Sequence, residues 1–181
     1  QVTSRAALTP EMKLTVKAVK KAVRFLKKQN AKKINGYYYG IVHPDCSYDL
    51  TEDARWIDAV KYKNPERIYN GEIGEIEGAR FVETTEAKIW AKAGAAKSTS
   101  DTTKIDVYGT LIFGANAYAT TKIEGGGLKT IIKQLGSAGT GDPLDQRATV
   151  GWKALKVTEI LTEAYMIRIE TASTFSDGEA N

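Results

Sequence analysis

The chain has 181 residues, 42% of them hydrophobic and 27% charged, which suits one globular domain or two small lobes. No apolar stretch reaches the roughly 20 residues of a membrane span, and the N-terminus lacks the apolar region of a signal peptide. One cysteine excludes an internal disulfide bond and a cysteine-based zinc site, so we expect a reducing compartment. Because the chain begins with Gln1 rather than Met, we expect a fragment or a processed product.

The net charge of +4 is distributed unevenly. Between Glu11 and Lys33 there are nine Lys or Arg and one Glu, whereas the remainder holds 17 basic and 21 acidic residues. The sequence therefore describes a mildly acidic body with one basic segment.

This basic segment has the pattern of a long helix from Pro10 to about Lys33. Thr9 can cap it, Pro10 has the fixed φ of a first turn, and Asn35-Gly36 is a stop signal. Apolar residues recur at helical spacing at Met12, Val16, Val19, Val23 and Leu26. A cationic flank has the same spacing and consists of Lys13, Lys17, Lys20, Arg24 and Lys27. This cationic flank is either a solvated face or a surface that meets a polyanion or another protein's carboxylates.

The next element is a predicted buried strand, the aromatic and β-branched run Tyr37–Val42. Pro44 ends it, because proline cannot donate to a sheet ladder. A helix capped by Asp49 or Thr51 should follow. Its apolar positions are Leu50, Ala54, Ile57 and Val60.

Between that strand and that helix lie His43, Asp45 and Cys46, the residue types of a thiol nucleophile and its base. Such a pair is usually brought together from distant segments, whereas here a prolyl corner holds both residues along an extended path. We interpret the segment as a structural corner, with a cysteine hydrolase as the alternative.

The middle of the chain predicts strands and turns. Residues 67–84 should form strands around an Asn70-Gly71 turn. Gly71, Gly74 and Gly78 fit tight turns better than a dinucleotide site, because they do not open a helix. 

Two stretches, 91–104 and 136–142, are expected to be exposed, mobile loops because of their composition. Between them, residues 105–113 predict a buried strand that passes into a short helix at 114–118, and residues 128–134 predict another strand.

Residues 147–173 contain two apolar-alternating stretches broken near Thr162-Glu163, which predicts a long antiparallel hairpin packed with the opening helix. No pattern indicates an enzyme. The glycines of residues 124–130 lack the spacing of a Walker loop, and no metal cluster, nucleotide fingerprint or acid–base pair is visible. We expect no catalytic residue, no cofactor and no metal.

Several strings follow one another between residues 37 and 173. They are HPDCSYDL, then Trp56, then IYNGEIGEIEGARFVET, LIFGANAY, GGGLKTIIKQLGSAGTGDPLDQRATVGWKA and MIRIETAS. This order resembles the phage major capsid proteins of the coliphage N-four type. Its most specific parts are the His-Pro-Asp strand end, the Asn-Gly-Glu-Ile-Gly turn and the Asp-Pro-Leu-x-Gln-Arg…Gly-Trp-Lys passage.

The resemblance implies an α+β fold of the Hong Kong 97 type, with a long spine helix, a peripheral β-hairpin and an inserted α/β axial domain. Residues 10–33 would be the spine helix. The peripheral domain would comprise residues 1–35 and 146–181, and the axial domain residues 36–145, with both mobile loops towards the capsomer axis. The N-terminal arm and extended loop that link neighbours in such shells have no match here and are expected outside this chain.

The implied function is structural rather than enzymatic. The chain would be a major capsid subunit of a phage or prophage, forming hexamers and pentamers of an icosahedral shell around double-stranded DNA. Implied partners are further copies, DNA held without sequence preference, and scaffold, portal or decoration proteins, with no membrane. Assembly would occur in the host bacterial cytoplasm, and the final location would be the virion.

In such a shell the cationic flank would face DNA, with contact between subunits as the alternative. Two other functions remain open. An encapsulin-like compartment shares the fold and differs in its cargo. A nucleic-acid-binding protein would explain the basic helix, and a steep salt dependence of binding would favour it.

Overall fold

The computed structural model describes residues 2–63, 73–98, 100–122, 126–137, 141, 142, 144 and 146–175, with the backbone alone for residues 60–63. The chain forms two compact units. The first, called the sheet unit below, comprises residues 1–117 and 162–181, and the second, the ribbon unit, comprises residues 118–161.

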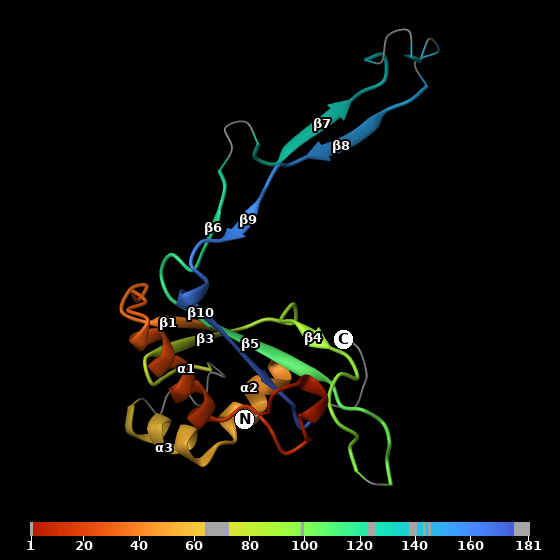
Figure 1. The fold of residues 1–181 in the computed structure, drawn as a ribbon. Helices are drawn as coiled ribbons and strands as arrows, with labels where there is room; N and C mark the ends of the chain where they lie inside the picture. The colour runs from red at the N-terminus through yellow and green to blue at the C-terminus, as the bar shows by residue number, and fades with distance from the viewer. Residues whose placement is uncertain are drawn as a thin grey trace. The chain divides into compact units, whose positions relative to one another are not determined.

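The sheet unit is a mixed α+β body built on one sheet (Figure 1). In spatial order its strands are β10 (Met166–Thr171), β5 (Val107–Phe113), β1 (Tyr38–Val42), β3 (Ala79–Glu83) and β2 (Glu75–Ile76), while β4 (Ile89–Trp90) also pairs with β5. The pairings are antiparallel except for the parallel pair β1–β3. The strands predicted at 37–42 and 105–113 are therefore confirmed as β1 and β5. Because β5 has partners on both edges, nearly all of its residues are buried.

The helices of this unit are α1 (Val16–Lys28), α2 (Pro44–Thr51) and α3 (Ala54–Lys63), with short 3-10 turns at η1 (Arg5–Ala7) and η3 (Glu163–Tyr165). The predicted single helix after β1 is thus wrong. The chain forms α2 directly after the prolyl corner and α3 after a break. Neither Asp49 nor Thr51 caps them, because His43 caps α2 and Asp53 precedes α3.

The opening helix begins later than predicted, at Val16 rather than Pro10. The Thr15 side chain accepts a hydrogen bond from the Ala18 amide at 3.4 Å and caps it. The preceding residues are drawn to the sheet instead, since the Met12 carbonyl accepts from the Ala172 amide at 3.0 Å, just beyond β10. This long-range pairing overrides the local preference for helix.

The same helix also ends earlier than predicted. Asn30 takes the left-handed conformation with a φ of 55°, and the Ala31 amide donates to the Leu26 carbonyl at 3.0 Å, which together form a Schellman end. Asn35-Gly36, predicted as the stop, is a tight turn with φ values of 49° and 88°, and residues 34 and 37 pair across it.

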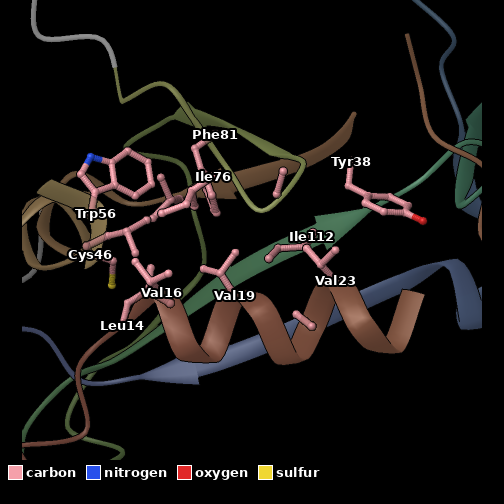
Figure 2. Close-up of a cluster of buried hydrophobic side chains, with 14 of the residues drawn as sticks. Leu14, Val16, Val19, Val23, Tyr38, Cys46, Trp56, Ile76, Phe81 and Ile112 are labelled. Carbon is pink, nitrogen blue, oxygen red and sulfur yellow. The ribbon is translucent and has the colours of Figure 1, made fainter. Parts of the chain in front are cut away.

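The core lies between α1 and one face of the sheet (Figure 2). The apolar stripe of α1 is buried, as its spacing predicted, at Val16, Val19, Ala22, Val23 and Leu26. Gly40 of β1 has a specific place here, since a Cβ atom on it would lie 2.6 Å from the Phe81 ring. A glycine at this position therefore leaves room for Phe81, whose ring packs edge-on against Trp56.

The hairpin β2–β3 turns at Glu77-Gly78, with φ values of 53° and 82°, and Gly74 also has a positive φ of 78°. Tight turns are thus confirmed at Gly74 and Gly78. The hairpin predicted around Asn70-Gly71 lies outside the described residues.

The ribbon unit contains two pairs of antiparallel strands (Figure 1). Strands β6 (Tyr118–Thr120) and β9 (Thr158–Ile160) form one pair, and β7 (Lys129–Lys133) and β8 (Thr149–Lys153) form the other. The predicted strand at 128–134 is confirmed. The helix predicted at 114–118 is wrong, because a turn with Asn116 at a φ of 61° leads directly into β6.

The C-terminal hairpin predicted for residues 147–173 is also wrong as a strand pairing, although its second stretch packs with the opening helix as predicted. Its first stretch pairs with β7 and β6, while its second stretch is β10 and pairs with β5. Alternating apolar residues indicate a strand but do not identify its partner. The two units meet in the sequence at residues 117 and 118 and at residues 161 and 162, so residues 1–35 and 36–117 share the sheet unit. The assignment of peripheral and axial domains stays a prediction.

Candidate interaction surfaces and the polar corner

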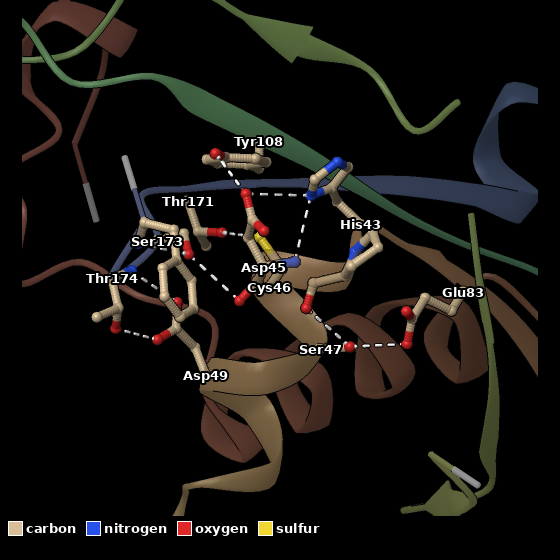
Figure 3. A network of polar contacts seen from close by, with 12 residues as sticks. His43, Asp45, Cys46, Ser47, Asp49, Glu83, Tyr108, Thr171, Ser173 and Thr174 are labelled. Atoms are coloured by element: carbon tan, nitrogen blue, oxygen red, sulfur yellow. Dashed lines mark hydrogen bonds and ion pairs between the residues drawn. The ribbon is translucent and has the colours of Figure 1, made fainter. Parts of the chain in front are cut away.

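His43 lies at the corner between β1 and α2, and its side chain is buried among neighbouring residues (Figure 3). The Asp45 amide donates to the His43 Nδ1 at 3.2 Å, and His43 thereby caps α2. The Asp45 carboxylate accepts from the Tyr108 hydroxyl at 2.7 Å and lies 3.4 Å from the same His43 nitrogen. Burial, and then this hydrogen bond to Asp45, raise the pKa of Tyr108.

Cys46 is fully buried and faces β10, where its sulfur lies 3.8 Å from the Thr171 hydroxyl. Burial raises the pKa of the Cys46 thiol to about 12, so the thiolate needed for nucleophilic attack is absent at neutral pH. These observations favour the structural interpretation of the corner over a cysteine hydrolase.

Further polar contacts join α2 to distant segments (Figure 3). The Ser47 hydroxyl donates to Glu83 on β3 at 2.9 Å, and the Ser173 hydroxyl donates to the Asp45 carbonyl at 3.2 Å. Asp49 accepts from the Thr174 amide at 3.0 Å and from the Thr174 hydroxyl. The corner thus joins α2 to β3 and to the segment that follows β10.

The cationic flank is only partly one surface. Lys17, Lys20, Arg24 and Lys27 are exposed on α1. Lys13, in contrast, precedes the helix and pairs with Ala172. Lys20 lies 3.2 Å from Glu77, so a carboxylate of the same chain already meets part of the flank.

The structure also contains a second cationic site, which the sequence did not predict. It is called the Trp90 cluster below and consists of Arg5, Trp90, Arg168 and Glu170. Arg5 donates twice to Glu170, at 2.7 and 2.9 Å, and its guanidinium lies 4.0 Å from the centre of the Trp90 ring. Arg168 lies 2.8 Å from Glu170 and 5.1 Å from the same ring centre. No local pattern could have indicated it, since Arg5 and Glu170 are 165 residues apart.

The strands of the ribbon unit expose their side chains throughout. Its large apolar residues that remain exposed are Tyr118, Leu128, Ile131, Ile132, Leu135, Leu144, Val150, Trp152, Leu155, Val157, Ile160 and Leu161. A two-stranded ribbon has no second layer that could cover such side chains. This concentration is typical of a surface that is buried against another molecule.

Two other kinds of site are absent from the described part of the chain. No helix there is both long enough and apolar enough to cross a membrane. Among the same residues, no three His, Cys, Asp or Glu side chains are grouped so that they could hold a metal ion.

The chain has relatives among known families and structures. The sequence model of a family described as phage capsid protein matches residues 3–135. No curated protein sequence matches the chain.

Three solved structures show the shared fold. The capsid of Ralstonia phage GP4 has a TM-score of 0.66 at 15% identity, over 99% of this chain and 52% of that chain. The capsid of Cyanophage P-SCSP1u has a TM-score of 0.63 at 17% identity, over 96% of this chain and 53% of that one. The acid-stable capsid of Helicobacter pylori bacteriophage KHP30 has a TM-score of 0.60 at 12% identity, over 94% and 62%. This chain therefore spans 52% to 62% of the length of these three chains.

Proposed function

Because the chain belongs to the phage capsid protein family, we propose that it is part of a major capsid subunit that assembles in many copies into an icosahedral shell around double-stranded DNA. The observation that carries this proposal is that the sequence match to the family and the structural match to known capsids cover the same chain. The family match covers most of the chain, and the fold of three capsid chains extends over 94% to 99% of it.

The chemistry of the sheet unit supports a structural and not an enzymatic role. The residue types most suited to catalysis, His43 and Cys46, are buried and joined to the fold by hydrogen bonds. A shell subunit needs a rigid body with edges that meet neighbours at slightly different angles. The sheet with its fastened helices supplies such a body, and the ribbon unit supplies an uncovered apolar surface.

The finer assignment is the Hong Kong 97 type of capsid fold and the coliphage N-four type of sequence. The ordered strings from HPDCSYDL to MIRIETAS support it. In this assignment the subunits form hexamers and pentamers, assembled in the host cytoplasm with scaffold, portal or decoration proteins as partners. A structure of an assembled shell would test this, together with the bounds of the peripheral and axial domains and the place of the loops near the capsomer axis.

Electron microscopy of the protein, expressed from its complete reading frame, tests the proposed function. Closed shells of uniform size are the expected result, and their absence under conditions where the protein is soluble and folded would contradict it. The contents separate two kinds of shell. Nuclease-protected DNA in particles from infected or induced cells indicates a virion, whereas an enclosed protein cargo indicates an encapsulin-like compartment.

The cationic flank of α1 belongs to the same proposal as a DNA-facing surface, with pairing between subunits as the alternative. Changing Lys17, Lys20 and Lys27 together to Gln separates the two. Normal empty shells with a salt-dependent loss of packaged DNA would support contact with DNA. Failure to form shells would assign the flank to contacts between subunits.

A further inference from the structure

The strand register of β7 and β8 sorts their side chains onto two faces of different chemistry. Lys129 is directly opposite Lys153, and Lys133 is opposite Thr149, with Ile131 and Gly151 between them. Because residues opposite one another and residues two apart share a face, all of these lie on one side. We call this side the lysine face.

The other side of the same ribbon is apolar. Ile132 is opposite Val150, and Thr130 is opposite Trp152. The exposed fractions of Ile132, Val150 and Trp152 are 64%, 76% and 74%. This apolar face is the one that association with protein would cover. The lysine face, on the opposite side, would then remain uncovered and could contact a partner of another kind.

The lysine face concentrates positive charge. Lys129 and Lys153 are direct cross-strand neighbours, about 5 Å apart at Cβ, and like charges in this arrangement repel. None of the three lysines is in an ion pair with a residue that the structure describes. In the middle of the face Gly151 leaves open space beside Ile131, since a Cβ atom on Gly151 would meet nothing within 4 Å. A surface whose lysines have no ion-pair partner among the described residues suits an extended anion.

We propose that the lysine face of β7–β8 binds the phosphate backbone of double-stranded DNA without reading its sequence. The inference rests on the proposed function, in which the shell encloses DNA, and it adds a second DNA contact besides the one proposed for the α1 flank. Phosphates attract lysines as point charges and need no precise geometry. Binding then releases the counterions that DNA holds, which gives the contact its salt dependence.

The acidic surface of a second copy is a weaker partner, because most described carboxylates of the sheet unit already have a contact within the chain. Those engaged are Asp45, Asp49, Asp53, Glu75, Glu77, Glu83, Asp101, Asp106 and Glu170. Among the described residues of its sheet unit, a neighbouring copy would therefore offer fewer carboxylates without a contact than with one.

The experiment compares the salt dependence of DNA binding by three triple variants of the chain. The probe is a short, fluorescently labelled DNA duplex of mixed sequence, titrated at several potassium chloride concentrations. The lysine-face variant carries Lys129→Gln, Lys133→Gln and Lys153→Gln. A matched control carries Lys88→Gln, Lys92→Gln and Lys104→Gln, three exposed lysines of the sheet unit. The α1 variant, with Lys17, Lys20 and Lys27 changed to Gln, measures the contribution of the other proposed DNA contact.

Each lost phosphate contact lowers the slope of log K against log salt by about 0.9. The lysine-face variant should therefore lose up to about 3 units of slope, while the control keeps the slope of the unchanged chain. Equal slopes for the lysine-face variant and the control would overturn the inference, as would a lack of DNA binding by the unchanged chain at low salt. So would a lysine-face variant that binds DNA normally and forms no shells, since the face would then be a contact between subunits. Shell formation by the unchanged protein is measured separately. Its absence contradicts the proposed function, whereas normal shells with unchanged salt slopes contradict only this inference.

Discussion

The Cys46 sulfur lies next to the Thr171 hydroxyl, and the His43 Nδ1 accepts a hydrogen bond from the Asp45 amide. Both contacts are ones that a substituted polar side chain can repeat, because Ser offers a hydroxyl and Gln offers an amide oxygen. The corner therefore depends on hydrogen-bonding capacity and on volume more than on the chemistry of a thiol or an imidazole.

We predict that Cys46→Ser and His43→Gln leave shell formation intact and change the free energy of unfolding by about 1–2 kcal/mol at most. Urea denaturation followed by circular dichroism measures the stability, and electron microscopy scores the shells. Normal stability together with lost assembly would show that the corner has a specific role in assembly.

Glu170 gives the Trp90 cluster a defined pH dependence. The hydrogen bond from Arg5, followed by the charge of Arg168, lowers the pKa of Glu170 below its ordinary value of 4.5. A carboxyl with a lowered folded-state pKa stabilises the protein above its ordinary pKa, and this contribution is lost as the pH falls through the folded-state value.

We predict that Glu170→Gln lowers the urea midpoint of unfolding at pH 7, and that the difference from the unchanged chain disappears as the pH falls below 4.5. The exposed Glu86→Gln is the control and should show no such convergence. A difference for Glu170→Gln that stays constant from neutral to acidic pH would mean that the charge of Glu170 is not the cause.

At the scale of elements, one carboxylate serves two helices. The Asp53 Oδ2 accepts from the Val16 amide at the start of α1, and its Oδ1 accepts from the Arg55 amide at the start of α3, both at 3.0 Å. The free amides at helix starts need such acceptors. Asp53 therefore couples the position of α1 to that of α3.

We predict that Asp53→Ala destabilises the sheet unit by about 1–3 kcal/mol, since each lost cap costs about 0.5–2 kcal/mol. Asp58→Ala, an exposed residue of α3, is the matched control. Denaturant unfolding of both variants measures the difference. Equal losses would indicate that the contact to Val16 has no energetic weight.

The loop of residues 91–104 stays a predicted mobile loop. In the structure its arms pair through Ala96 and Lys104, and most of its side chains are exposed. Limited proteolysis of the free chain should cut there before it cuts β1 or β5, because proteases need a segment that opens locally. First cuts inside the sheet would contradict the prediction. The companion loop 136–142 lies partly outside the described residues.

The elements that the sequence predicted correctly are those whose cause is local. Pro44 ends β1, and the mainly apolar run of β5 is typical of a strand buried on both faces. The ends of α1 were missed because Ala172 pairs with Met12 and because Asn30 takes a left-handed conformation. The pairing of β10 with β5 was not predicted for a similar reason, because the two strands lie far apart in the sequence.

For the whole molecule, the resemblance of ordered strings predicted the capsid family, which the match over residues 3–135 confirms. Composition alone would have led only to an α+β protein with a basic segment. The Trp90 cluster and the two faces of the ribbon required the structure, because they depend on pairings that no periodicity in the chain specifies.

We predict that the isolated chain self-associates through the apolar face of the ribbon. Ile132→Thr with Val150→Thr should lower the apparent mass in light scattering at high protein concentration, since threonine keeps the β-branched shape and removes apolar surface. Val82→Thr, an exposed position on β3, is the control. An equal decrease in the control would mean that the association is not specific to the ribbon.

The pairing of β5 with β10 also affects how the chain folds during synthesis. Met166 is the partner of Phe113, so the whole ribbon unit must leave the ribosome before the second edge of β5 can be closed. Until then, β5 presents an unpaired apolar edge, which is the kind of surface that recruits other chains. Nascent or truncated chains that stop before Met166 should therefore depend on chaperones, whereas chains that reach Thr171 can complete the sheet on their own.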